Sequence, residues 1–314
     1  MTRLRCLPAL AALLALAGTS PAPAQSDPAT PAPHRFERLR ERLAGSLDDG
    51  TDTDQAAHVA PAGTRVVPDI AYGPDPAQRF DVYVSTRPAA NAAAAPVIFF
   101  VHGGGWARGD KTNGRVLAPK VAHWVDQGYV VISANYRMLP TPVAQQAEDV
   151  AAAIAFAQAQ AGAWGGDAKR FILMGHSAGA HLVALLAAGA RTAAKPQPWR
   201  GAVLLDSAAL DVPVIMEHRH LGLYDRAFGA DPSQWTAVSP VAQLARETAP
   251  MLAVCSSRRR ESCGQADRFA AKANGLGGSV RVLREDLSHM EINATLGAAS
   301  DYTTQVDAFM QSVR

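Results

Sequence analysis

From residue 65 onward, the hydrophobic positions of the chain alternate between two patterns. Short apolar runs bounded by Gly, Pro and Asp predict strands, and longer stretches with apolar positions three and four residues apart predict helices. A run such as Val-Ile-Phe-Phe-Val at 97–101 is apolar throughout, which is typical of a strand buried on both faces. The predicted strands cover residues 65–72, 80–85, 97–101, 129–134, 171–175, 202–206, 251–255 and 280–284.

Helical patterns separate most of these strands. They cover residues 117–127, 142–161, 178–190, 265–276 and 301–313. Strands that alternate with helices predict a mostly parallel sheet with helices on both faces, and therefore an α/β domain. We place this domain at residues 65–314. Residues 212–238, which include several Gly and Pro, break the alternation, so we expect them to form a short cap insertion over the carboxyl edge of the sheet.

The first 24 residues have the pattern of a secretory signal peptide. Arg3 and Arg5 precede an apolar stretch at 7–17, and Ala22-Pro23-Ala24 supplies small residues for cleavage. A membrane anchor is the alternative, but the apolar stretch is shorter than the roughly 20 residues that a span needs. We therefore expect cleavage near Ala24 and export to the periplasm or the medium. Residues 25–64 are predicted to be a linker that contains a short amphipathic helix at 35–44.

Composition and cysteine count narrow the possibilities further. The 314 residues carry a formal net charge of +2, which argues against a nucleic-acid partner, because such proteins have a strong basic excess. Three cysteines are present, and cleavage of the leader removes Cys6. The remaining cysteines are Cys255 and Cys263. In an exported protein such a pair is expected to form a disulfide, and two free thiols are the alternative.

The most specific motif is Gly175-His-Ser177-Ala-Gly179. It follows the predicted strand at 171–175 and precedes an apolar helix, which is the context of a nucleophile elbow. The two glycines allow a sharp turn, and the helix directs its N-terminal amides toward the serine. A serine needs a base to become a nucleophile. We therefore predict that Ser177 is a catalytic nucleophile.

A second motif, His102-Gly-Gly-Gly-Trp106, follows the apolar strand at 97–101. Consecutive glycines let the main chain approach a ligand closely, and backbone amides stabilise the oxyanion that forms during acyl transfer. The amide of Ala178, directly after the serine, is expected to complete such an oxyanion hole. A phosphate-binding turn is the alternative, but the loop has neither G-K-[ST] nor G-x-G-x-x-G.

Together, HGGGWARGDK, ANYRMLP, Gln146-Ala-Glu148-Asp149 and GHSAG resemble the α/β-hydrolase serine esterases and lipases with an HGGGW oxyanion loop. The similarity covers about residues 65–310 and is greatest to the branch of feruloyl and acetyl-xylan esterases and arylformamidase-like enzymes. It implies an α/β-hydrolase fold and an oxyanion hole from the amides of Gly104, Gly105 and Ala178. It also implies a structural role for His102, and Trp106 is expected to form part of the substrate-binding wall.

A triad on this fold follows the order serine, acid, histidine. Only His289 lies after the last predicted strand, in a segment expected to be a loop, and we predict that it is the base. The family places an Asp after the strand at 251–255, where this chain has only Glu261, so Glu261 is the predicted acid. Alternatively, Glu261 pairs with the neighbouring arginines, and Asp206 or Asp211 is the acid.

These features predict an exported serine hydrolase that cleaves carboxylic esters through an acyl-enzyme. The substrate is expected to be a small-molecule or polymer-attached ester, and no cofactor or metal is expected, because no ligand motif is present. An amide-directed hydrolase, such as an arylformamidase, is the first alternative. A non-catalytic binding module on the same fold is the second, because a fold does not determine function.

Overall fold

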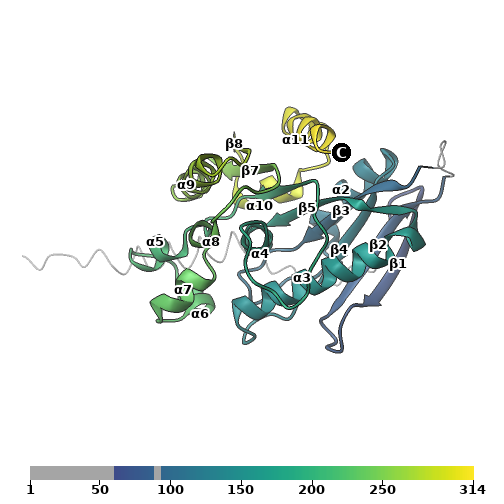
Figure 1. Cartoon of the computed structure of the whole chain (residues 1–314). Helices are drawn as coiled ribbons and strands as arrows, with labels where there is room; N and C mark the ends of the chain where they lie inside the picture. Colours follow the sequence, from purple (N-terminus) through teal and green to yellow (C-terminus); the bar gives the residue numbers. More distant parts are fainter. Residues whose placement is uncertain (1–59, 88–92) are drawn as a thin grey trace, which may run out of the picture. The chain divides into compact units, whose positions relative to one another are not determined.

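An eight-stranded sheet runs through the computed structural model, which describes residues 60–87 and 93–314 (Figure 1). The strand order is β1-β2-β4-β3-β5-β6-β7-β8. Strand β2 pairs antiparallel with β1 and β4, and every other pair is parallel. The strands are β1 (Thr64–Ala71), β2 (Arg79–Ser85), β3 (Ala95–Val101), β4 (Val130–Ala134), β5 (Gly166–His176), β6 (Gly201–Leu205), β7 (Met251–Ser256) and β8 (Val280–Glu285). The predicted mostly parallel α/β sheet is confirmed.

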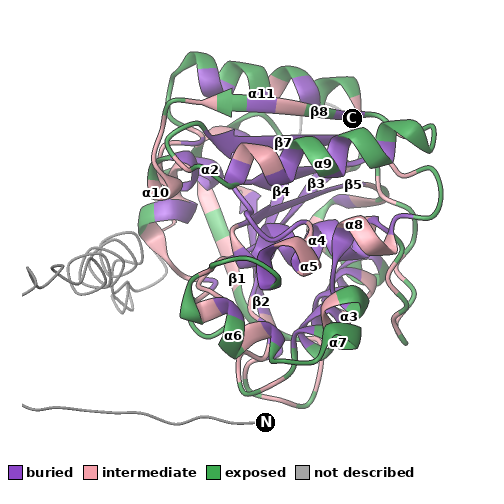
Figure 2. Cartoon of the chain, turned by 90° about the vertical axis from the view of Figure 1, so that its left-hand side faces the viewer, coloured by how far each residue is buried: buried purple, intermediate pink, exposed green. Residues whose placement is uncertain are grey.

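Helices cover both faces of this sheet. They are α2 (Gly114–Asp126), α3 (Val143–Gln160), the 3₁₀ turn η1 (Ala161–Trp164), α4 (Ala178–Ala187), α9 (Ser262–Gly275), α10 (His289–Ala294) and α11 (Asp301–Ser312). One hydrophobic core joins the sheet to α3, α4 and α9, and a second core joins its other face to α2, α10 and α11. In Figure 2 the strands are mostly buried, and the outward faces of the helices are exposed.

The burial of each strand follows its position in the sheet. All residues of β4 and β6 are buried, as their continuous apolar sequences predict for central strands. Strands β1 and β8 lie at the edges and are more exposed: β1 has only intermediate and exposed positions, and β8 has two buried positions, Val280 and Leu283. The glycine loop at 102–106 and the Gly175–Gly179 motif follow β3 and β5, which are adjacent central strands, so the two motifs emerge side by side at the carboxyl edge.

The insertion predicted at residues 212–238 folds into short helices: α5 (Val212–Met216), α6 (Gly222–Phe228), α7 (Pro232–Ala237) and α8 (Pro240–Gln243). Figure 1 shows them grouped at one end of the sheet. Pro213, Pro232 and Pro240 occupy the first turns of α5, α7 and α8, where proline suits the helix because its missing amide hydrogen would have no partner there. We refer to α5–α8 as the cap.

The predicted signal peptide and most of the predicted linker, including the helix expected at 35–44, lie outside the described residues. Within the described residues, we find no helix that combines the length and the apolar character needed to span a bilayer.

Candidate active site

Ser177 lies on a sharp turn between β5 and α4. Its φ of 53° and ψ of −116° are unusual for a residue with a side chain, and its amide donates to Leu205 O at 2.9 Å. Neighbouring glycines make this turn possible. A Cβ on Gly179 would lie 2.2 Å from Val101 O, and a Cβ on Gly175 would lie 2.5 Å from the Gly179 carbonyl carbon. The G-x-S-x-G spacing therefore lets α4 pack directly against β3 and β5, with Ser177 partly exposed at the turn.

The glycine loop after β3 lies directly beside this serine. A Cβ on Gly103 would be 3.0 Å from the Ser177 Cβ, and a Cβ on Gly104 would be 2.0 Å from Arg108 O. Gly104 and Gly105 have φ values of 116° and 58°, which favour glycine. His102 is buried, and its Nδ1 donates to Gly103 O at 2.7 Å, so this side chain supports the loop. The position of this loop suits an oxyanion hole beside Ser177. That the amides of Gly104, Gly105 and Ala178 are its donors stays a prediction.

Trp106 connects the glycine loop to the cap. Its side chain is 3% exposed, and its ring packs against Tyr224 and Phe228 of α6. The indole Nε1 donates to Nδ1 of His181 at 3.2 Å, while His181 Nε2 donates to Val238 O at 2.8 Å. Burial lowers the pKa of His181 to about 4, so this imidazole is neutral. Trp106 thus anchors the cap, and direct contact between this ring and a substrate stays a prediction.

His289 is the first residue of α10, although the sequence analysis expected a loop here. Ser288 accepts from the Glu291 amide, and the Glu291 carboxylate accepts from the Ser288 amide, which together form a capping box. The S-x-x-E spacing was the signal that could have predicted this helix. His176, next to Ser177, donates from Nε2 to the His289 carbonyl at 3.0 Å, and the two rings lie 4.4 Å apart. This contact places His289 beside the elbow.

The carboxylate next to His289 belongs to Asp206, one of the two alternative acids, and not to Glu261, the acid predicted from the sequence. His289 Nδ1 donates to Asp206 Oδ2 at 2.6 Å. Strand register explains this position, because His176 of β5 pairs with Leu205 of β6, which brings Asp206 alongside Ser177. Asp206 also has a φ of 53°, a left-handed conformation that Asp tolerates better than most residues.

Glu261 lies elsewhere. Its side chain is exposed, and the residue serves as the N-cap position of α9. The other alternative, Asp211, is the N-cap residue of α5, and its amide donates to Gln265 Oε1 at 2.5 Å. The family pattern predicts the acid after β7, whereas the carboxylate beside His289 follows β6. An Asp directly after a buried strand that neighbours the nucleophile strand was the available signal.

Asp206 is fully buried and is surrounded by donors. Oδ1 accepts from the Ser256 amide at 2.6 Å and from the Ser262 hydroxyl, and Oδ2 accepts from His289 and from Arg259 Nη1 at 2.6 Å. Burial by itself raises the pKa of this carboxyl. The hydrogen bond from His289 and the charge of Arg259 outweigh burial and hold the pKa well below its usual range. The carboxylate is therefore ionised and able to stabilise an imidazolium.

Arg259 is a site residue that sequence reasoning missed. The sequence suggests the arginines at 258–260 only as possible partners of Glu261, but Arg259 Nη1 contacts Asp206 Oδ2 and lies 2.8 Å from His289 Nδ1. Its side chain is 26% exposed, and it belongs to the loop between β7 and α9. A run of three equivalent arginines carries no signal for which of them turns inward. The cation beside His289 opposes protonation of the imidazole.

Replacement of Arg259 by Met is therefore expected to move the acid limb of the kcat/KM–pH profile to higher pH by about one unit, because the imidazole then gains a proton more easily. A pH series with an ester substrate measures this shift. Arg260→Met is the matched control, because Arg260 is exposed, and its profile should coincide with that of the wild type. Coincident profiles for all three proteins would remove Arg259 from the site.

The loop that carries Arg259 is closed by Cys255 and Cys263. Their sulfur atoms lie 1.98 Å apart, at the distance of a disulfide bond, and their Cα atoms are separated by 5.1 Å. Cys255 is the fifth residue of β7, and Cys263 lies in the first turn of α9. A crosslink between a strand and the following helix would restrain the intervening loop, and Arg259 with it.

Loss of this crosslink is expected to lower the free energy of unfolding by about 2–3 kcal/mol, because the unfolded chain regains the entropy of a short closed loop. Urea unfolding of a Cys255→Ser, Cys263→Ser double variant measures the loss. A thiol reductant should destabilise the wild type by a similar amount and leave the double variant unchanged. Equal stability of wild type and variant in the absence of reductant would indicate two free thiols.

Comparisons with known proteins add independent information. A protein-family model described as BD-FAE matches residues 80–208. A probable isoprenylcysteine alpha-carbonyl methylesterase from Oryza sativa subsp. japonica is 35% identical over 121 residues, which are 38% of this chain and 28% of that protein. Esterase LipC from Mycobacterium tuberculosis is 38% identical over 122 residues, or 37% of this chain and 28% of that protein. The matched segment thus spans less than a third of either relative.

Solved structures resemble the chain over a greater length. Esterase B from Lactobacillus rhamnosis has a TM-score of 0.70 at 17% identity, with 88% of this chain and 94% of that chain covered. Thermogutta terrifontis esterase 2 has a TM-score of 0.64 at 21% identity, with 80% of this chain and 95% of that chain covered. These likenesses concern the fold, and the residues matched by the family model include the glycine loop and the elbow.

Proposed function

We propose that this chain is a member of the α/β-hydrolase esterase family and an exported serine carboxylesterase whose triad is Ser177, His289 and Asp206. The observation that carries the proposal is the hydrogen bond of 2.6 Å from His289 Nδ1 to the buried Asp206, beside a serine on a strained elbow. Because Nδ1 carries the proton in this bond, Nε2 is the basic nitrogen. That tautomer is the one a general base needs.

In the proposed reaction, Ser177 Oγ attacks the ester carbonyl carbon while His289 Nε2 accepts the hydroxyl proton. The buried Asp206 carboxylate stabilises the imidazolium. The carbonyl oxygen becomes an oxyanion next to the glycine loop, where the amides of Gly104, Gly105 and Ala178 are the proposed donors. His289 then gives the proton to the leaving alcohol. Water attacks the acyl-enzyme by the same route and releases the acid.

The aromatic residues of the cap support a role for the cap in substrate selection. Tyr224 and Phe228 of α6 stack near Trp106, which in turn follows the oxyanion loop. An aromatic group at this place offers an apolar wall to the acyl or alcohol part of an ester. Export is supported by the sequence of the leader and by the pairing of Cys255 with Cys263, since disulfides persist in oxidising compartments.

A covalent probe tests the proposal. The mature protein should hydrolyse p-nitrophenyl acetate, and an alkyl p-nitrophenyl phosphonate should stop this activity with one adduct per chain. Peptide mass spectrometry should place the adduct on Ser177. The kcat/KM values for an ester and a formamide of similar size then separate esterase from amide-directed activity. A folded protein that neither hydrolyses the ester nor forms the adduct would be a binding module, and the proposal would be wrong.

A further inference from the structure

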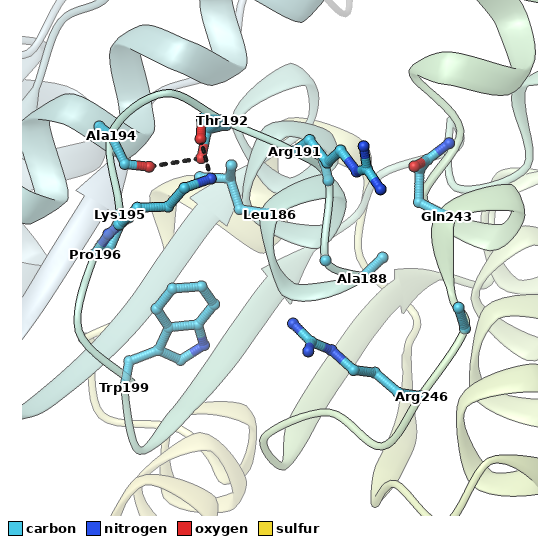
Figure 3. A pocket seen from close by; sticks show the side chains of 13 residues that line it. Leu186, Ala188, Arg191, Thr192, Ala194, Lys195, Pro196, Trp199, Gln243 and Arg246 are labelled. Atoms are coloured by element: carbon cyan, nitrogen blue, oxygen red, sulfur yellow. Dashed lines mark hydrogen bonds between the residues drawn. The ribbon is translucent and has the colours of Figure 1, made fainter.

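A cavity lies at the end of α4 that is remote from Ser177. Ser177 precedes the first residue of α4, whereas the cavity surrounds the last turn and the segment after it. Ten helical residues correspond to about 15 Å, so the two places are well separated. The cavity has a volume of about 520 Å³, within the range of small-molecule sites. Its principal lining side chains are Leu186, Arg191, Lys195, Trp199, Gln243 and Arg246 (Figure 3).

The charge of this cavity is one-sided. Arg191, Lys195 and Arg246 line it, and none of its lining residues carries a carboxylate. Within the described part of the chain, no carboxylate forms an ion pair with Arg191 or Arg246. The carbonyls at the end of α4 do not need these cations, because the amides of Ala188, Gly189 and Ala190 already donate to carbonyls of the last turn. Lys195 Nζ donates to the Thr192 carbonyl, so Arg191 and Arg246 are the cations available to an anion that enters from solvent.

Trp199 supplies an unused hydrogen-bond donor. Its indole Nε1 is buried and has no hydrogen-bond partner in the described structure. In Figure 3, Trp199 and Arg246 point toward one another, and the nitrogen edge of the indole is on the side of Arg246. A buried N–H group without an acceptor is unfavourable, and such a group in a native structure calls for an explanation. An acceptor oxygen of a ligand would satisfy this donor.

We propose that this cavity is a second binding site, distinct from the proposed catalytic site, for an organic carboxylate whose body presents a flat face, as an aromatic ring and the C–H face of a sugar both do. Guanidinium groups bind carboxylates through paired hydrogen bonds, and the indole N–H adds a third donor. The ring of Trp199, with Leu186 and Pro196, offers an apolar wall for the flat body. Two sources share this chemistry: an aromatic acid released by hydrolysis of an ester, and an acidic sugar of a polymer.

The indole resonance of Trp199 gives a direct readout. The chain has five Trp residues, so a ¹H–¹⁵N spectrum resolves few indole peaks, and Trp199→Phe assigns the relevant one. Sodium benzoate should shift this peak with saturation, and the neutral isostere benzamide should not. Arg246→Gln should weaken benzoate binding by about tenfold or more. Arg115→Gln is the matched control, because Arg115 is exposed on α2, which covers the other face of the sheet.

The same titration distinguishes the two sources. Tighter binding of benzoate than of glucuronate assigns the site to aromatic acids, and the reverse assigns it to acidic sugars. The proposal is overturned if neither acid shifts the peak up to about 20 mM, a range that includes weak fragments. It is also overturned if benzamide or inorganic phosphate acts as strongly as the better acid. The readout needs no ester hydrolysis, so it stands apart from the test of the esterase proposal.

Discussion

Replacement of Asp206 by Asn is expected to lower kcat for ester hydrolysis by about 10⁴-fold, while Glu261→Gln changes it less than about twofold. All four groups around the Asp206 carboxylate are donors, from Ser256, Ser262, Arg259 and His289. An Asn offers one oxygen and must turn its NH₂ group toward two of these donors. If the NH₂ group replaces Oδ2, the His289 imidazole loses its acceptor. If it replaces Oδ1, the Ser256 amide and the Ser262 hydroxyl lose theirs. In both cases the tautomer and position of His289 are disturbed.

The measurement is a comparison of kcat for wild type, Asp206→Asn and Glu261→Gln with one p-nitrophenyl ester. Circular dichroism and unfolding curves for each protein show whether a loss of rate comes from loss of fold. Glu261→Gln is the matched control, because its carboxylate is exposed at the start of α9. A large loss in Glu261→Gln together with an active, folded Asp206→Asn variant would return the acid to the position that the family pattern suggests.

The fold could be predicted from the sequence because the signals that determine it are local and repeated. Apolar runs such as 97–101 are buried in central strands, and the prolines and glycines at 212–238 mark the cap. The elbow was predictable for the same reason. Gly175 contacts Gly179 within the motif itself, so this part of the geometric requirement is local, whereas Gly179 is required by the approach of the Val101 carbonyl at the end of β3.

The acid and Arg259 could not be predicted in this way, because their positions depend on contacts between distant segments. Asp206 and His289 are 83 residues apart, and the register between β5 and β6 brings the carboxylate to the elbow. The choice of Arg259 over its two arginine neighbours depends on how the loop between β7 and α9 folds over Asp206. Helix α10 is an intermediate case, since its capping box was visible in the sequence and was overlooked.

A buried lysine that contacts helix α10 is expected to make the stability of the protein depend on pH. Lys120 of α2 is 1% exposed, and its Nζ lies 5.4 Å from the centre of the Phe100 ring. It donates to Val116 O at 2.8 Å and to the carbonyl of Asn293 in α10, the helix that begins with His289. Burial lowers the pKa of Lys120 to about 7. The buried imidazole of His176 also experiences the Lys120 charge, and burial keeps that imidazole neutral by lowering its pKa well below the usual value.

The stability of the protein is therefore expected to rise with pH between about 7 and 10, the interval between the pKa of Lys120 in the fold and that of a free lysine. In this interval the unfolded chain binds one proton more than the folded chain, so each pH unit adds about 1.4 kcal/mol to the free energy of unfolding. Below this interval Lys120 is charged in both states, and the full cost of its burial is present. Lys120→Met has a similar length and no titrating group, so it removes this dependence.

Urea unfolding of wild type and Lys120→Met at pH 7 and at pH 9.5 tests the assignment. Other titrating groups act equally in both proteins, so their contribution cancels in the difference between the two unfolding free energies. From pH 7 to pH 9.5, the unfolding free energy of the wild type should rise by about 3 kcal/mol relative to that of Lys120→Met. A constant difference would mean that Lys120 keeps its proton throughout. The hydrogen bond to Asn293 would then be that of a permanent ammonium group, and α10 would be held on α2 equally well at every pH in this range.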